Sequence, residues 1–408
     1  MSSQGVSSQV QSTATGDRRS QTWSLWPVVP LYPYGQRRTL MQTVVPDTIW
    51  TFDQLQGIFY VVVPIRMTIV KLQPAGLLVY SPVAPTAECL AMVRSLERQH
   101  GPVQYIVMST TTGIEHKVFA GPFARQFPDA QVYVAPHQWS FPINLPLSWL
   151  GLPFGRTHVI NPSKPLPFAE QIDCAVLGPI RLNLGSFVEV VLFHRTSRTL
   201  LLTDALVSIP DAPPAVLQID PYPLLFHARD RAREPIQDTP ANRVRGWQRI
   251  ALFAFYFQPS ALDVPTLKQA WQEAQEAPDR SRRAYYGLYP FRWQSDWAKS
   301  FQTLHGEGRP FVAPVLQTLI FNRAANLVLD WVDRVAQWPF ERVIPCHLDA
   351  PLNMNATEFR AAFEFLKGSP AYQHSRLPDA DFRFLKELET TLVRRGITPP
   401  ASRTGRTY

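Results

Sequence analysis

The sequence contains little cysteine and no long apolar run. Its three cysteines, Cys89, Cys174 and Cys346, are too few and too scattered for a disulfide framework or a CxxC zinc site, and they favour a reducing compartment. No apolar run reaches the roughly 18 residues that a membrane-spanning helix needs, and the N-terminal residues lack the apolar core of a secretory signal. These absences predict a soluble cytoplasmic protein, or a protein of the chloroplast stroma if the source is a plant or alga.

Lysine, and charged residues in general, are also scarce. Charged residues make up 18% of the chain, and its 40 basic residues comprise seven lysines and 33 arginines, for a net charge of +8. The planar guanidinium group of arginine suits bidentate contacts with carboxylates or phosphates, although arginine also serves as an ordinary surface residue. No cluster of basic residues has aromatic residues interleaved with it, so a nucleic-acid partner is not expected.

Apolar residues and proline are plentiful. The chain is 45% apolar and has 39 prolines, so it can bury a large core while proline stiffens its loops. We expect a disordered tail over residues 1–22, where serine, threonine and glutamine dominate, and another over 394–408. A single domain is expected over 23–393, since no low-complexity linker divides it. Its one irregular insertion is expected at 136–155.

The pattern of apolar and polar residues predicts an α/β protein. Strands rich in β-branched and aromatic residues come first and suggest a meander. Strands and helices then alternate, which is typical of a layered α/β fold, and a helical region precedes the last strand. Strands are expected at 49–53, 57–64, 66–72, 76–83, 103–110, 130–136, in a hairpin at 187–207 and at 342–347. Helices are expected at 86–101, 115–128, 245–257, 266–277, 314–338, 356–366 and 379–393.

Acidic residues and histidines stand at the ends of three of these strands. Glu115 and His116 come soon after the strand that ends at Ser109, Asp204 follows "TLLLT", and His347 follows "RVIPC". In α/β sheets such strand ends collect at one edge and form ligand sites, and two histidines with two carboxylates suit a divalent metal. Each residue alone also has an ordinary structural role: a hydrogen-bonded loop histidine, a turn aspartate or a glutamate at a helix N-terminus.

The order of these parts resembles the metallo-β-lactamase fold. Members of that fold carry the motif HxHxDH after a strand, a histidine before a hairpin, an aspartate after the hairpin and a last histidine near the C-terminus. The phrases "GIEHKVFAGPFARQFPDAQVYVAP", "HRTSRTLLLTDAL" and "VIPCHLDAP" more closely resemble an uncharacterised domain-of-unknown-function family of oxygenic phototrophs, cyanobacteria and plants, which is thought to share the fold. This resemblance covers nearly the whole chain outside the tails. It implies a four-layer αββα sandwich with an N-terminal arm and C-terminal helices.

The resemblance is carried over residue by residue. If His116 stands on the last histidine of HxHxDH, then Thr111 and Gly113 stand on the first two histidines and Glu115 stands on the aspartate. The two histidine positions are therefore lost. Glutamate in place of aspartate adds one methylene group, which a shift of the backbone would have to absorb.

The later ligands of the metallo-β-lactamase pattern are partly present in this sequence. Asp204 matches the aspartate after the hairpin, His347 matches the final histidine, and the histidine expected before the hairpin has no counterpart in residues 183–187. The resemblance therefore implies that the ligands of the family's first metal site are lost and that the ligand types of the second are kept. These ligands would be Glu115, His116, Asp204 and His347, and they would hold one zinc or iron ion if they hold any metal.

Two functions are compatible with this degenerate metal site. One is a non-catalytic relative with a binding or scaffold role, and the other is a single-metal hydrolase of an ester-like or anionic small molecule. Asp349 and Thr111 would stand behind the ligands, Asp349 as an acid that orients His347. Arg66 and Lys117 are expected near the mouth of the site, where they would hold a small anionic ligand or simply face solvent.

The insertion at 136–155 is apolar and rich in tryptophan and proline. Its sequence, "PHQWSFPINLPLSWLGLPFG", is too irregular for a helix and leaves a strand near the expected site. Three roles are open for it: a lid over the site, a patch that contacts a membrane surface or a protein partner, or a loop folded onto its own core.

Overall fold

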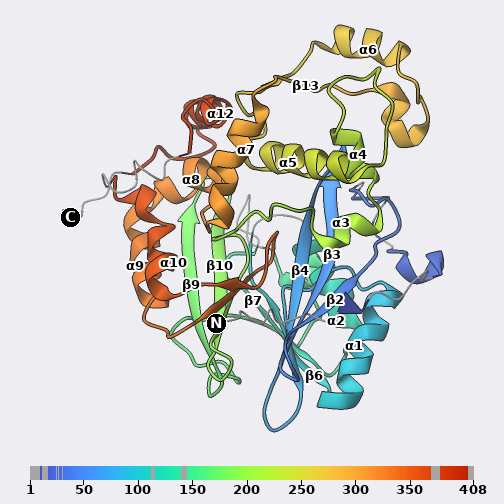
Figure 1. Ribbon diagram of the computed structural model, residues 1–408. Coiled ribbons are helices and arrows are strands. Elements are labelled where there is room, and N and C mark those ends of the chain that lie inside the picture. Colours follow the sequence, from blue (N-terminus) through green and yellow to red (C-terminus); the bar gives the residue numbers. More distant parts are fainter. Residues whose placement is uncertain are drawn as a thin grey trace, which may run out of the picture.

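Two β-sheets pack face to face, with helices on both outer faces (Figure 1). The arrangement comes from a computed structural model, which describes residues 10–11, 17–23, 25, 27–29, 31–111, 115–138, 145–368 and 377–402. It confirms the α/β sandwich expected from the sequence. Much of the two expected tails, together with residues 139–144 of the apolar insertion, lies outside the described residues.

The first sheet has eight strands, which lie in sequence order. β1 to β5 pair antiparallel and form the expected meander, whereas β5 to β8 pair parallel. α1 carries the chain back between β5 and β6, α2 does so between β6 and β7, and a longer segment that contains η2 joins β7 to β8. Its strands are β1 (Val10–Gln11), β2 (Leu40–Val45), β3 (Ile49–Ile58), β4 (Val61–Lys71), β5 (Leu77–Tyr80), β6 (Val103–Met108), β7 (Gln131–Val134) and β8 (Thr157–Val159).

The second sheet has five strands in the order β15-β14-β11-β10-β9. β10 and β11 form the expected hairpin, and β11 pairs parallel with β14. The strands are β9 (Ile172–Arg181), β10 (Ser186–His194), β11 (Thr199–Leu202), β14 (Arg342–Pro345) and β15 (Leu352–Asn353). A separate pair, β12 (Leu262–Asp263) and β13 (Arg292–Trp293), lies in the helical region.

Two helices, α1 (Ala87–His100) and α2 (Lys117–Arg125), cover the outer face of the first sheet. The side chain of Thr86 caps α1, as the sequence predicts. α2 buries Phe119 and Phe123 against the sheet, which confirms the apolar stripe expected at this spacing. The two helices thus form the first outer layer of the sandwich.

The remaining helices belong to the second half of the chain. α9 packs against β9 as the other outer layer, and α4, α5 and α7 lie above the sheets, where the tip of the β3–β4 hairpin reaches them (Figure 1). None of the described helices is long and apolar enough to span a membrane. The helices are α3 (Ala215–Ile219), α4 (Tyr222–His227), α5 (Pro240–Tyr256), α6 (Leu267–Gln275), α7 (Trp297–His305), α8 (Pro314–Leu319), α9 (Ala325–Val335), α10 (Ala356–Ala361) and α12 (Arg383–Arg394). The short 3-10 helices are η1 (Arg18–Gln21), η2 (Leu147–Leu150), η3 (Arg282–Gly287), η4 (Gly306–Gly308), η5 (Phe321–Arg323) and η6 (Glu364–Leu366).

The core between the two sheets consists of inward-facing aliphatic side chains. Val70 and Leu78 from the first sheet meet Val190, Leu201 and Ile344 from the second, and each is at most 1% exposed. Full burial of one such side chain stabilises the fold by roughly 1.5–3 kcal/mol. This layer fixes the two sheets relative to each other, and with them the strand ends that carry the site.

One hairpin turn lies where the sequence pattern predicts a strand. The expected strand at 57–64 is interrupted, because β3 and β4 meet in a turn at Phe59 and Tyr60. Both residues have positive φ angles, 52° and 61°, which are uncommon for aromatic residues. Phe59 stacks on Tyr285 with ring centroids 4.3 Å apart, and Tyr60 meets Tyr222 at 5.2 Å. These contacts offset the cost of the left-handed backbone.

Two further expectations are corrected towards the C-terminus. The helix expected at 314–338 is divided into α8, η5 and α9. Residues 394–402, expected as part of a disordered tail, instead return to this break, where the backbone N–H of Ser402 donates to the carbonyl oxygen of Asn322 at 2.7 Å. The interrupted helix and the packed tail therefore support each other. The disordered tail expected at residues 1–22 is also corrected in part, because Arg18–Gln21 form η1.

Candidate functional site

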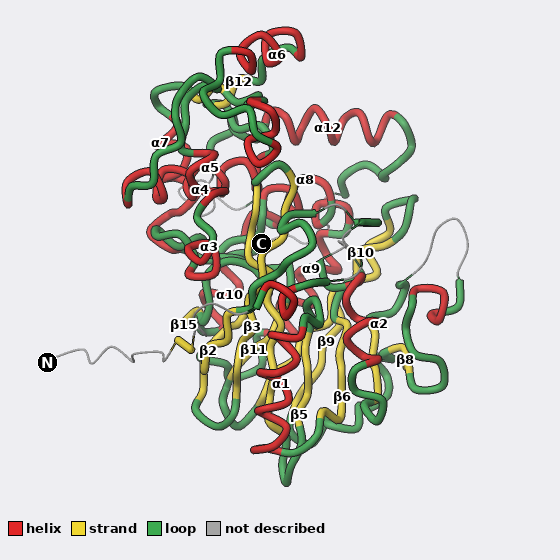
Figure 2. Tube along the Cα trace, turned by 90° about the vertical axis from the view of Figure 1, so that its right-hand side faces the viewer, coloured by secondary structure: helices red, strands yellow, loops and turns green. Residues whose placement is uncertain are grey.

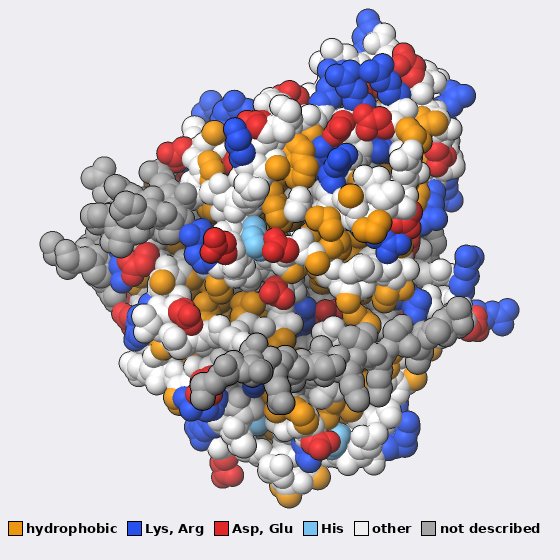
Figure 3. Space-filling model, viewed as in Figure 1, with side chains coloured by type: hydrophobic (Ala, Val, Ile, Leu, Met, Phe, Trp, Pro, Cys, Tyr) orange, Lys and Arg blue, Asp and Glu red, His pale blue; other side chains and the backbone are white. Residues whose placement is uncertain are grey.

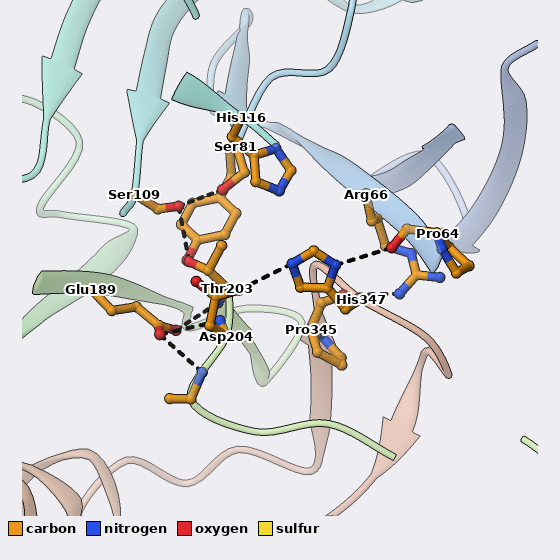
Figure 4. A network of polar contacts seen from close by, with 12 residues as sticks. Pro64, Arg66, Ser81, Ser109, His116, Glu189, Thr203, Asp204, Pro345 and His347 are labelled. Carbon is orange, nitrogen blue, oxygen red and sulfur yellow. Dashed lines mark hydrogen bonds and ion pairs between the residues drawn. The ribbon is translucent and has the colours of Figure 1, made fainter. Parts of the chain in front are cut away.

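Four strands end at the same place, and each is followed by a hydroxyl or thiol side chain. Ser81 follows β5, Ser109 follows β6, Thr203 follows β11 and Cys346 follows β14. All four are buried. The hydroxyl of Ser109 hydrogen-bonds the hydroxyl of Ser81 and lies 3.0 Å from the hydroxyl of Thr203 (Figure 4). The carboxyl ends of strands from both sheets are therefore joined at one edge, where α/β folds commonly bind ligands.

His347 and Asp204 form a hydrogen-bonded pair at this edge. The Nε2 atom of His347 lies 3.0 Å from Oδ1 of Asp204, and its Nδ1 atom lies 3.0 Å from the carbonyl oxygen of Pro64 (Figure 4). A carbonyl oxygen and an ionised carboxylate only accept hydrogen bonds, so this arrangement favours a protonated imidazole that donates from both ring nitrogens. Burial opposes this charge, but the hydrogen bond and the charge of Asp204, helped by Glu115, raise the pKa of His347 above its ordinary value.

His116 lies beside this pair at the N-terminus of α2. Its ring centroid is 6.1 Å from that of His347, and its Nδ1 atom lies 3.2 Å from the carbonyl oxygen of Pro82. The Nε2 atom is buried and has no hydrogen-bond partner among the described residues. Burial, together with the nearby His347, lowers the pKa of His116 to about 4. The ring is therefore neutral at neutral pH, with an unshared electron pair on Nε2.

The structure gathers the four predicted ligands in one region without forming a metal centre. His116, Asp204 and His347 lie together, and Glu115 is near enough for its charge to act on His347. Both histidines place Nδ1 against a proline carbonyl, which is how metal-binding histidines are commonly oriented. However, the Nε2 atom of His347 is engaged by Asp204, and within the described residues no group of three or more His, Cys, Asp or Glu side chains could hold a metal ion. The residues as arranged therefore do not fit a metal ion.

A buried glutamic acid, which was not among the residues predicted from the sequence, holds the turn that carries Asp204. Glu189 on β10 is 0% exposed and accepts hydrogen bonds from the backbone N–H groups of Thr203 at 2.6 Å, Asp204 at 3.2 Å and Ala205 at 2.9 Å. Burial, and then the charge of Asp204, raise the pKa of Glu189 to about 8. A single acid inside the apolar run "FVEVVLF" is the signal that could have revealed it, since a buried acid needs partners.

Arg66 is a buried structural residue, which corrects its expected role at the mouth of the site. It is 3% exposed and forms a bidentate ion pair with Asp53, with N–O distances of 2.7 and 2.9 Å. Its two Nη atoms also donate to the carbonyl oxygens of Pro345 and Leu348, at 2.8 and 2.9 Å. Because these carbonyls flank His347, the guanidinium group fixes the segment that carries this histidine and is not available to an anionic ligand.

Two other predicted residues contact backbone groups. The hydroxyl of Thr111 donates to the carbonyl oxygen of Ser186 at 2.8 Å and accepts from the backbone N–H of Val188 at 2.9 Å, so it joins the end of β6 to β10. The ammonium group of Lys117 donates to the carbonyl oxygen of Gln138, and burial lowers its pKa. These contacts position the segments around the site.

Asp349 does not take the orienting role expected for it. The two ring nitrogens of His347 are engaged by Pro64 and Asp204. The carbonyl oxygen of Pro64, and not the carboxyl group of Asp349, therefore orients the imidazole together with Asp204. The backbone N–H of Asp349 donates to the carbonyl oxygen of Ser208 at 3.1 Å. Gly113, the other position of a lost histidine, lies outside the described residues.

The fold and the site define a class and a family. Two packed sheets with outer helices form an α/β sandwich, and two histidines and an aspartate gather at its strand ends. The chain belongs to the family described as a domain of unknown function, DUF4336, whose model matches residues 46–365. No curated protein matches the chain in sequence.

Several solved structures have a similar arrangement. The DIM-1 metallo-β-lactamase exposed to ceftazidime is 11% identical, with a TM-score of 0.36, over 82% of this chain and 98% of that chain. A flavoprotein from Thermotoga maritima is 9% identical, with a TM-score of 0.41, over 82% and 63%. The metal-soaked Flv1 flavodiiron core from Synechocystis is 8% identical, with a TM-score of 0.39, over 80% and 60%. The chain spans less than two thirds of the length of the last two, and similarities this distant carry no activity over to it.

Proposed function

We propose that this protein has a binding or scaffold role and that its metal site is degenerate. The observation that carries the proposal is that Asp204 already contacts His347 and Glu189. Its carboxylate is 3.0 Å from the Nε2 atom of His347, and its backbone N–H is held by Glu189 at 3.2 Å. A carboxylate that compensates a buried imidazolium loses that compensation if it turns to a metal ion, and leaving a buried charge unpaired is costly.

The surroundings of the pair support the same proposal. The hydroxyls of Ser81, Ser109 and Thr203 bond to one another, so the strand ends are held together by hydrogen bonds. The predicted small anionic ligand belongs to this proposal, with Lys117 rather than Arg66 as its cation, since Lys117 is only partly buried. Origin in an oxygenic phototroph, and residence in the cytoplasm or chloroplast stroma, also remain proposals.

Metal analysis of the purified protein tests this function. After expression with zinc and iron supplied, we expect the wild-type protein to contain either metal only in substoichiometric amounts. The variants His116→Ala and His347→Asn should contain the same amounts, because these side chains hold no ion in the proposed state. Asparagine keeps a donor towards Asp204, so at least this variant is expected to fold, which circular dichroism would check.

An exposed histidine on β8 provides the control. His158→Ala should lower only the weak metal binding that any surface histidine contributes. Near-stoichiometric zinc or iron that is lost in His116→Ala and His347→Asn, and kept in His158→Ala, would contradict a degenerate site.

A single-metal hydrolase is the second candidate, and His116 is the observation that favours it. Its buried Nε2 atom has no partner among the described residues, and such atoms are uncommon unless water, an ion or a ligand satisfies them. This candidate requires Asp204 to release His347 when zinc or iron is loaded. Stoichiometric metal at the site, together with metal-dependent hydrolysis of an ester that His116→Ala abolishes, would establish it.

A further inference from the structure

Two aromatic side chains stand out from the surface beyond α2. Trp149 in η2 is 74% exposed, and Phe154 in the turn that follows is 93% exposed. Val159, on the neighbouring strand β8, is 52% exposed. β8 and α2 lie at one side of the molecule, far from α6 (Figure 2). Exposed apolar side chains grouped in this way commonly mark a contact surface.

The loop between the two aromatics is fastened to α2. The Nη1 atom of Arg125 donates to the carbonyl oxygen of Gly151 at 2.8 Å. A Cβ atom on Gly121 would lie 2.2 Å from the same oxygen, so the helix and the loop are in direct contact at a position where only glycine fits. Leu152 is buried, at 6% exposure. The loop therefore has a firm support, and its two outer aromatics are presented to solvent rather than folded onto the core.

The sequence around this loop contains more basic than acidic residues. From residue 117 to residue 164 the sequence has four basic residues and one acidic residue, Asp129. The basic residues are Lys117, Arg125, Arg156 and Lys164. Arg125 and Lys164 are exposed, and basic side chains near a membrane surface are attracted to anionic lipid headgroups.

We propose that Trp149 and Phe154 insert into the surface of an anionic lipid membrane while Arg125 and Lys164 face the headgroups. Aromatic side chains favour the level of the headgroups, where an apolar body meets a polar layer, and membrane binding combines apolar insertion with electrostatic attraction. The positive charge beside the aromatics favours a lipid surface over a protein partner, because an apolar protein pocket would not need it. The inference is independent of the site at the strand ends.

Helix α6 offers a matched comparison. Leu267 and Trp271, one turn apart, are 89% and 61% exposed, so they form another exposed apolar face. Here the acidic Glu273 and Glu276 lie on or directly after the same helix, together with the basic Lys268. Glu273 and Glu276 also line a pocket with Arg231, Arg233 and Arg292. Acidic and basic side chains are interspersed over the top of the molecule (Figure 3), where Figure 1 places α6. A tryptophan on α6 therefore tests apolar exposure where acidic and basic side chains are mixed.

Co-sedimentation with vesicles tests the proposal. The wild-type protein should bind vesicles of phosphatidylcholine mixed with phosphatidylglycerol, and should bind phosphatidylcholine alone more weakly. Binding should also weaken in high salt. The double variant Trp149→Ser, Phe154→Ser should bind the mixed vesicles at least roughly ten-fold more weakly, since two apolar side chains no longer leave water. Trp271→Ser should bind like the wild type.

Several outcomes would overturn the proposal. One is the absence of wild-type binding to the mixed vesicles, and another is an equal loss of binding in Trp271→Ser. If the wild type instead forms a stable oligomer that the double substitution dissociates, the surface is a protein contact and the proposal fails. All replaced side chains are exposed, so thermal melting of the variants should match that of the wild type and separate lost binding from unfolding.

Discussion

Replacing Arg66 with methionine is expected to lower the free energy of unfolding by about 3–5 kcal/mol, as when one partner of a buried ion pair is removed. Methionine would leave the carboxylate of Asp53, a residue that is only 5% exposed, without its counter-charge. The carbonyl oxygens of Pro345 and Leu348 would lose their donors as well. Chemical denaturation followed by circular dichroism measures the loss.

Arg195 provides the control, because it also forms a bidentate ion pair but does so on the surface. It binds both carboxylate oxygens of Asp173, and its side chain is 48% exposed. Arg195→Met should therefore cost at most about 1 kcal/mol. The double variant Asp53→Leu, Arg66→Met should be more stable than Arg66→Met alone, since no buried charge is left unpaired. Equal losses for Arg66→Met and Arg195→Met would contradict this interpretation.

The same ion pair shows why part of the structure could not be predicted from the sequence. Asp53 and Arg66 are direct cross-strand partners in the β3–β4 ladder, and this register follows from counting outwards from the turn at Phe59 and Tyr60. Neither aromatic residue is typical of a turn, so the sequence predicts neither the turn nor the ion pair. The turn depends on contacts with residues far along the chain, such as Tyr285.

The position of the candidate site was more predictable than its internal bonding. His116, Asp204 and His347 come from distant parts of the chain, yet the strand-end rule brings them together because the carboxyl ends of β6, β11 and β14 meet at one edge. The rule does not predict which of these three side chains hydrogen-bond to each other. The pairing of Asp204 with His347 depends on the turn after β11, and that turn is held by Glu189, a residue from the neighbouring strand.

Some helices are determined by the local sequence, and others depend on residues far along the chain. α1 follows from its threonine cap and apolar spacing, both of which are local and readable in the sequence. The long helix expected at 314–338 also has continuous local signals, but the chain breaks it near Asn322, where the backbone N–H of Ser402 donates to the carbonyl oxygen of Asn322. Local patterns therefore predict an element well only where no distant residue stabilises an interruption.

The stability of the protein in acid is expected to depend strongly on His227, the last residue of α4. It is 1% exposed, and its Nε2 atom lies 3.2 Å from the carbonyl oxygen of Phe59. Burial, reinforced by the charges of Arg229 and Arg249, lowers the pKa of His227 from 6.5 to about 3, although the hydrogen bond to Phe59 opposes the shift. Between these two values the unfolded chain binds a proton that the folded chain does not. The contribution of His227 to stability is thus complete above about pH 6.5 and is lost as the pH falls towards about 3, by up to about 1.4 kcal/mol per pH unit.

His227→Gln removes this titration and keeps an amide donor for the carbonyl of Phe59. Free energies of unfolding measured across the same pH range should fall less steeply in the variant, with a difference that approaches about 4–5 kcal/mol over the whole range. The variant should also be less stable at neutral pH, because glutamine replaces a ring packed beside Phe291, so the slopes are compared and not the absolute values. The exposed His158, replaced by glutamine, should leave the wild-type slope unchanged. An unchanged slope in His227→Gln would mean that acid acts on the fold through other buried groups, of which His116 is the first to test because burial also keeps it neutral.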